Sequence, residues 1–333
     1  MRIVKFFIGI PLGFLLLAGL WFALFQLQLG ASPASSQWVY DVVQKKQAVA
    51  ERIQPDGEHR RIVFLGGSNV LFGIDAREIG RELNIPAVNF GLSAVLRTEQ
   101  AFSAVKQSLK SGDTLVLALE YSNYYYHEKL SAIELDYTLA HDAEYYRRLP
   151  LEKKMGVVLS VSSVRLMKGL IARFSPRNNE SGTYQVRTID DYGDETSNAR
   201  VSMPEVYKRG MLSTRPLAYH FDADNKFWLI YEDFLQWCSE HQVQVMVTFP
   251  SYLYFPDYEK QEQRTSFAAL VDWHLKRNIV VLGTPYDFMY RPEDMYDTRY
   301  HLNDGGRSKR TGKIIELLKK ERIGFSSAQA SGR

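Results

Sequence analysis

The sequence contains little cysteine and only a small excess of one charge over the other. Each of these features excludes a class of protein. Cys238 is the only cysteine among 333 residues, which excludes an internal disulfide framework. It lies in an apolar helical pattern that predicts a buried, inert thiol. The net charge is only +3 and no run of basic residues forms a stripe. Nucleic-acid binding needs such a basic surface, so no nucleic-acid partner is expected.

The sequence also offers no recognisable metal or cofactor motif. Four acidic residues lie between positions 190 and 195, but their spacing matches no EF-hand pattern. We therefore predict no metal site and no cofactor.

A long apolar run at residues 6–25 contains no charge and is rich in Leu and Phe. As a helix it would span about 30 Å, the thickness of the hydrocarbon core of a bilayer. Arg2 and Lys5 precede the run and the next charge is Asp41. The positive-inside rule then predicts a single-pass protein of the inner (cytoplasmic) membrane, with a cytoplasmic N-terminus and a periplasmic main domain.

The alternative for this run is a cleaved signal peptide, because the small residues at 31–35 could hold a cleavage site. The run is longer than the apolar region of a typical signal peptide, which favours an uncleaved anchor. Either alternative places the bulk of the chain outside the cytoplasm.

Short apolar runs at 62–65, 87–90, 114–119, 243–249 and 278–282 alternate with helical patterns. This alternation predicts an α/β fold, a three-layer, doubly wound parallel sheet of flavodoxin-like type. The predicted organisation is an anchor (1–29), a linker with a lead-in helix (30–59), the α/β domain (60–322) and a flexible tail (323–333). An insertion at about 128–222 carries a predicted helix at 157–174. Its polar loop, 177–200, is either a lid or glycan-contacting insertion, or disordered.

Ser68 follows the apolar run at 62–65 after two glycines, Gly66 and Gly67. These glycines permit a tight or positive-φ turn that lifts the serine to the C-terminal rim of the sheet, where open α/β folds bind ligands. Near the other end of the chain, Asp297 and His301 lie four residues apart before a helix that we expect to open at Gly312. An imidazole can take the proton of a serine hydroxyl while a carboxylate orients it, so the three residues form a candidate Ser-His-Asp triad.

These motifs resemble the blocks of the SGNH (GDSL-like) hydrolase superfamily, in particular its membrane-anchored, envelope-facing acyltransferase-type members. Gly66-Gly67-Ser68 is similar to the nucleophile block, with glycine where the family usually has aspartate. Asn89-Phe90-Gly91-Leu92-Ser93 resembles the second block and Glu120-Tyr121-Ser122-Asn123 the third. The resemblance implies an oxyanion hole made by Ser68, Gly91 and Asn123. Asp297 and His301 match the last block.

Four tyrosines and a histidine occupy residues 121–127. They either cover the edge of the core or form a wall of the substrate cleft. On the second interpretation, Tyr124, Tyr125 and Tyr252 are candidate substrate contacts. His127 is predicted to be structural, because His301 fits the role of base better.

Three functions stay open from the sequence. The first is an extracytoplasmic O-acyltransferase, moving O-acetyl groups onto an envelope glycan or exported polysaccharide. The resemblance implies that a multi-spanning membrane acyltransferase supplies the acyl group. The second is a carbohydrate O-acyl esterase. The third is a catalytically silent, membrane-anchored binding or assembly factor on the same scaffold.

Overall fold

The computed structural model describes residues 2–31, 34–54, 60–174 and 185–321. The chain divides into two compact units. The anchor unit comprises Met1–Tyr40 and Glu128–Thr183, and the sheet unit comprises Asp41–His127 and Tyr184–Arg333. The expected insertion at 128–222 is therefore divided, because the part after residue 183 belongs to the sheet unit.

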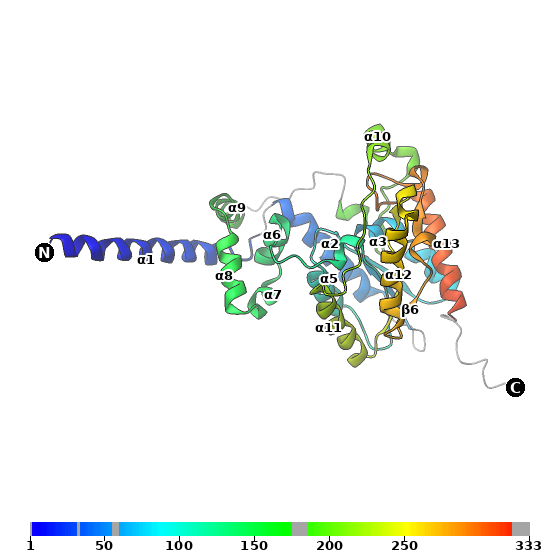
Figure 1. Cartoon of the computed structure of the whole chain (residues 1–333), viewed down its shortest axis with the longest axis horizontal. Helices are drawn as coiled ribbons and strands as arrows, with labels where there is room; N and C mark the ends of the chain where they lie inside the picture. The colour runs from blue at the N-terminus through cyan, green and yellow to red at the C-terminus, as the bar shows by residue number, and fades with distance from the viewer. Residues whose placement is uncertain (1, 32–33, 55–59, 175–184, 322–333) are drawn as a thin grey trace. The chain divides into compact units, whose positions relative to one another are not determined.

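The sheet unit contains a five-stranded parallel sheet in the order β2-β1-β3-β4-β6. Its edge strand β6 is labelled in Figure 1. Its strands are β1 (Ile62–Gly66), β2 (Ala87–Gly91), β3 (Thr114–Ala118), β4 (Gln244–Val247) and β6 (Val280–Val281). Every residue of β1, β2 and β3 is buried, as expected for parallel strands covered on both faces. The predicted doubly wound α/β fold is confirmed. A second, two-stranded sheet pairs β5 (Tyr252–Leu253) with β7 (Met289–Tyr290).

The helices of the sheet unit fall into two groups that contact within themselves. One group is α3 (Ser68–Gly73), α4 (Ala76–Leu83) and α13 (Asp304–Lys320), and the other is α5 (Thr98–Lys106), α11 (Phe227–Glu240) and α12 (Gln261–Leu275). Helix α10 (Glu205–Ser213) packs on the short 3-10 turn Pro292–Asp294. Cys238 is fully buried on α11, which confirms the predicted buried thiol, and burial raises its pKa to about 12.

Helix α13 begins eight residues before the predicted start at Gly312. Asn303 caps it, because its Oδ1 accepts a hydrogen bond from Gly306 N–H at 3.0 Å. Such a cap satisfies a backbone donor that has no intrahelical partner. The cap outweighs the low helix propensity of Gly305 and Gly306.

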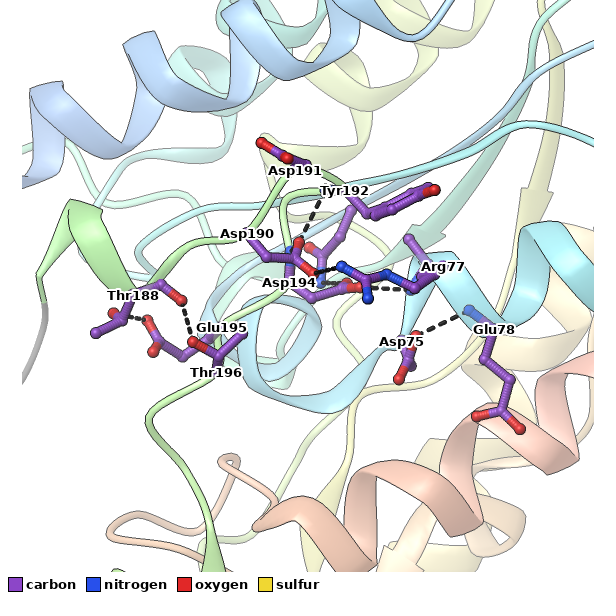
Figure 2. A network of polar contacts seen from close by, with 12 residues as sticks. Asp75, Arg77, Glu78, Thr188, Asp190, Asp191, Tyr192, Asp194, Glu195 and Thr196 are labelled. Carbon is purple, nitrogen blue, oxygen red and sulfur yellow. Dashed lines mark hydrogen bonds and ion pairs between the residues drawn. The ribbon is translucent and has the colours of Figure 1, made fainter.

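The polar segment at 185–198 is part of the folded sheet unit (Figure 2). Ile189 and Glu195 form an antiparallel bridge. Asp194 is buried and accepts hydrogen bonds from Ala76 N–H at 2.8 Å and from Asn89 Nδ2 at 2.9 Å. The alternative of disorder is wrong for these residues, because their polar side chains have partners on α4 and β2. Residues 177–184 lie outside the described part.

The anchor unit consists of helices, and α2 (Ala34–Arg52) leads from it into the sheet unit. Its other helices are α1 (Arg2–Gln28), α6 (Ala132–Ala140), α7 (Ala143–Arg148), α8 (Leu151–Ser160) and α9 (Ser163–Phe174). Residues Ile10–Gln28 are long and apolar enough to cross a membrane. The prediction of one helix at 157–174 is wrong: α8 and α9 meet at 88°, and Ser162 Oγ caps α9 by accepting from Arg165 N–H at 3.1 Å.

Candidate active site

Ser68 lies at the carboxyl end of β1, where α3 begins. The chain connects β1 to β2 on one side, and β3 pairs with β1 on the other, so this rim is a topological switch point. Ligands of open α/β sheets bind at such points. The two glycines are needed for space rather than for positive φ. A Cβ on Gly66 would lie 2.4 Å from Ala118 O, and one on Gly67 would lie 2.6 Å from Glu120 Oε1.

Asp297 and His301 are hydrogen bonded to each other, as predicted. His301 Nδ1 lies 2.6 Å from Asp297 Oδ1, and both side chains are less than 10% exposed. The loop that carries them is closed by a bridge between Met295 and Leu302 and by a hydrogen bond from Tyr296 N–H to His301 O at 2.8 Å. With Nδ1–H donated to the carboxylate, Nε2 is the ring atom left to accept a proton.

His301 lies against the helix that begins with the nucleophile. Its ring stacks on that of Phe72, with the centroids 4.3 Å apart and the planes at 12°. Phe72 is four residues after Ser68 on α3, so both project from the same helix face. His301 is also close enough to Glu120 to lower the pKa of that carboxyl. The structure therefore places His301, with its partner Asp297, against α3, the helix that begins with Ser68.

Glu120 is a site residue to which the sequence analysis gave no role. It directly follows the buried run of β3, and its Oε1 accepts hydrogen bonds from Ser68 Oγ and from Asn69 N–H, both at 3.1 Å. Burial raises the pKa of Glu120, an effect that His301 and these hydrogen bonds oppose. A signal was present in the sequence, because Glu120 is the first polar residue after an apolar strand on the same rim as Ser68.

The two other predicted oxyanion residues differ in their surroundings. Gly91 N–H donates to Asn89 Oδ1 at 2.8 Å, so the structure contradicts its assignment to the oxyanion hole. Its lack of a side chain serves packing instead, because a Cβ there would lie 2.1 Å from Leu71 N. Asn123 lines a small pocket together with Gly67, and its buried Oδ1 has no hydrogen-bond partner among the described residues. Asn123 and the N–H of Ser68 remain the predicted donors.

The tyrosines predicted as substrate contacts are mostly core residues. Tyr124 and Tyr252 are 2% and 1% exposed and pack in a cluster of aromatic rings around Tyr121 and Tyr219. The cleft-wall interpretation is wrong for both, because their rings cover the core edge. Tyr125 is half-buried and its hydroxyl accepts a hydrogen bond from His220 N–H at 2.9 Å.

Arg310 links α13, the helix after the Asp297–His301 loop, to α3, the helix that carries Ser68. It lies on α13, directly after the Asp–His loop, and is completely buried. Its guanidinium donates to Asn69 O at 2.6 Å, to Asn69 Oδ1 at 3.1 Å and to Phe249 O at 2.9 Å. Burial lowers the pKa of Arg310 to about 10, which leaves it charged at neutral pH. The residue next to the nucleophile is thereby fixed relative to the helix that follows His301.

The comparisons with known proteins find similarity in solved structures only. No family model matches the sequence, and no curated protein matches it. One similar structure is a protein from Desulfitobacterium hafniense described as a lipolytic protein of the G-D-S-L family, with 10% identity, a TM-score of 0.38, and coverage of 78% of this chain and 100% of that chain. Another is an acetyl xylan esterase, with 12% identity, a TM-score of 0.39, and coverage of 78% and 99%.

A third similar structure is a protein from Bacteroides fragilis described as an acylhydrolase, with 11% identity, a TM-score of 0.37, and coverage of 83% and 94%. Lipolytic and acyl-hydrolysing proteins are thus among the structures similar to this chain.

Proposed function

We propose that this chain is an extracytoplasmic, serine-dependent O-acyltransferase. It forms an acyl-enzyme on Ser68 and passes the acyl group, an O-acetyl group, to a hydroxyl of a cell-envelope or exported polysaccharide. The observation that carries the proposal is the hydrogen-bonded pair of His301 and Asp297, stacked on α3 one turn from Ser68.

In the first half-reaction Ser68 Oγ attacks the carbonyl carbon of the donor ester. Its proton moves to His301 Nε2, and Asp297 stabilises the imidazolium through the Nδ1–H hydrogen bond. The tetrahedral intermediate collapses, the ester C–O bond breaks, and His301 returns the proton to the leaving alkoxide. Ser68 Oγ donates to Glu120 in the structure, so it has to turn toward His301 for this step.

In the second half-reaction His301 takes the proton of an acceptor hydroxyl, which attacks the acyl-enzyme and releases Ser68. If water is the acceptor, the same steps make a carbohydrate O-acyl esterase. That activity is the second candidate, because the triad serves both acceptors equally.

The structure of the anchor unit supports a retained membrane anchor. Phe25 is fully buried in the core of this unit, and Gln28 is buried and hydrogen bonded to Arg165. Cleavage at residues 31–35 would remove both from the unit they stabilise. A retained anchor would keep the enzyme in the membrane beside a multi-spanning acyltransferase, the acyl donor implied by the resemblance.

The test uses the full-length protein in detergent, with a chromogenic acetyl ester and a serine-reactive fluorophosphonate. We expect ester turnover and an adduct on Ser68 by mass spectrometry, both lost in His301→Ala. Oligosaccharide acceptors then separate transfer from hydrolysis, since only transfer yields an acylated sugar. If wild type, Ser68→Ala and His301→Ala behave alike here and in complementation, the protein is a silent binding or assembly factor.

A further inference from the structure

Helices α8 and α9 of the anchor unit expose an apolar face. Seven large apolar side chains recur on them at spacings of three or four residues, as on one face of a helix. They are Leu151, Met155 and Leu159 on α8, and Val164, Met167, Ile171 and Phe174 on α9. Between 48% and 78% of each is accessible. Exposed apolar surface on this scale marks a site of interaction rather than ordinary protein surface.

This helix pair is fixed to the C-terminal end of α1. Helix α9 contacts α1, and Phe25 shares a core with Val157 and Leu166. The approach is close, because a Cβ on Gly169 would lie 2.2 Å from Gln28 Oε1. Within this unit, α8 and α9 lie at the end of α1 opposite to the N-terminus (Figure 1). If α1 spans a bilayer, α8 and α9 lie where it leaves the bilayer.

The bend between α8 and α9, and the length of each helix by itself, argue against a transmembrane span. Helices α8 and α9 contain 10 and 12 residues and meet at 88°. At 1.5 Å per residue each reaches no more than about 18 Å, which is short of the ~30 Å hydrocarbon core. Their charge suits a lipid surface, because exposed Lys153, Lys168 and Arg173 outnumber the exposed acid Glu152. An apolar face with basic residues around it is typical of helices that lie in a membrane interface.

We propose that α8 and α9 lie in the interface of the extracytoplasmic leaflet and insert their apolar faces between the lipid head groups and the acyl chains. The occupant of this face is lipid. The proposal rests on the retained anchor proposed above, because only an intact α1 places the pair at the bilayer surface. The anchor unit is then bound to the membrane by one spanning helix and one interfacial helix pair.

The test places an environment-sensitive dye on single cysteines of the full-length chain in vesicles of phosphatidylcholine and phosphatidylglycerol. In a Cys238→Ser background, Leu159→Cys and Ile171→Cys report on the face. Leu229→Cys is the matched control, because Leu229 is an exposed leucine on α11 of the sheet unit, 66% accessible. Unchanged circular dichroism and elution volume show that each variant is folded.

We expect dye at 159 and 171 to be blue-shifted, quenched by lipids with a nitroxide high on the acyl chain, and shielded from aqueous iodide. Dye at 229 should be quenched by iodide alone. Iodide quenching at 159 and 171 equal to that at 229 would overturn the proposal. Shielding from both quenchers would overturn it too, because protein would then cover the face. Neither readout depends on ester turnover, so failure here is distinct from failure of the proposed enzyme.

Discussion

At the residue scale, the position of the Glu120 carboxyl requires a residue without a side chain at position 67. The resemblance leads one to expect a carboxylate directly before the nucleophile, but position 67 is glycine. The space that a side chain there would fill is taken by the Glu120 carboxyl, which reaches Ser68 from the end of β3. A carboxyl group is thus present beside Ser68 although it comes from a different strand.

Replacing Asp297 should separate chemistry from folding. Asp297→Asn keeps the size of the side chain but lets the amide donate to Nδ1, which favours the wrong tautomer of His301. We expect kcat/KM on an acetyl ester to fall by a factor on the order of 10⁴. The free energy of unfolding, followed by urea denaturation, should change far less. Activity within tenfold of wild type would exclude the triad.

Glu120 gives a prediction about pH. Its folded pKa is raised above the ordinary value of 4.5, mainly by burial, so the folded state holds this proton more tightly than the unfolded state. Its contribution to stability is therefore fully present below pH 4.5 and is lost as pH rises through the folded pKa. Glu120→Gln cannot ionise, so its free energy of unfolding relative to wild type should increase as pH rises from 4 to 8.

Wild type and Glu120→Gln also test the role of Glu120 in catalysis. An ionised carboxylate beside Ser68 would repel an oxyanion and hold the hydroxyl away from His301. We expect the kcat/KM ratio of Glu120→Gln to wild type to rise with pH. A loss of 100-fold or more at every pH would instead identify Glu120 as a group required for the reaction.

At the scale of elements, Arg310 couples α13 to α3. Arg310→Met leaves four buried acceptors, on Asn69, Phe249 and Ser251, without this donor. We expect a loss of about 2–4 kcal/mol in the free energy of unfolding. Lys319→Met is the control on the same helix, since Lys319 and its partner Glu82 are 46% and 37% exposed, and a surface contact of this kind is worth about 1 kcal/mol or less. Equal losses in the two variants would contradict this coupling.

Folded Arg310→Met should also be less active than wild type, because Arg310 holds α3, the helix that carries Ser68. Asn69 also donates from Nδ2 to Ala118 O at 2.9 Å, so its side chain links α3 to both α13 and β3. The position of Ser68 therefore depends on the packing of α3, α13 and β3, which are distant in sequence.

At the scale of the whole molecule, the anchor unit decides whether the N-terminal segment is retained. Because Phe25 and Gln28 are built into its core, we expect protein extracted from membranes to keep its N-terminal helix. Intact mass measurement checks this directly. A mature N-terminus within residues 31–35 would identify a cleaved signal peptide and remove the basis for a permanent anchor.

The sequence by itself determined the parallel α/β fold, because buried strands read as short apolar runs whatever packs on them. It also supplied Ser68, His301 and Asp297 as the candidate triad, since the chemistry of a triad restricts the residue types. It did not locate the break between α8 and α9 or the start of α13. At these two positions the N-cap residues Ser162 and Asn303 set the helix boundary, although the apolar pattern suggests another one.

Only the tertiary structure decided the rest of the site. Glu120 reaches Ser68 across 52 positions of sequence, and Gly91 loses its predicted role because its N–H is used by a side chain two residues away. The same holds for Tyr124 and Tyr252, which are buried by aromatic rings from other elements. The periodicity of apolar residues indicates which side chains a strand or helix buries. The hydrogen-bond partners of a side chain depend instead on how elements that are distant in sequence pack together.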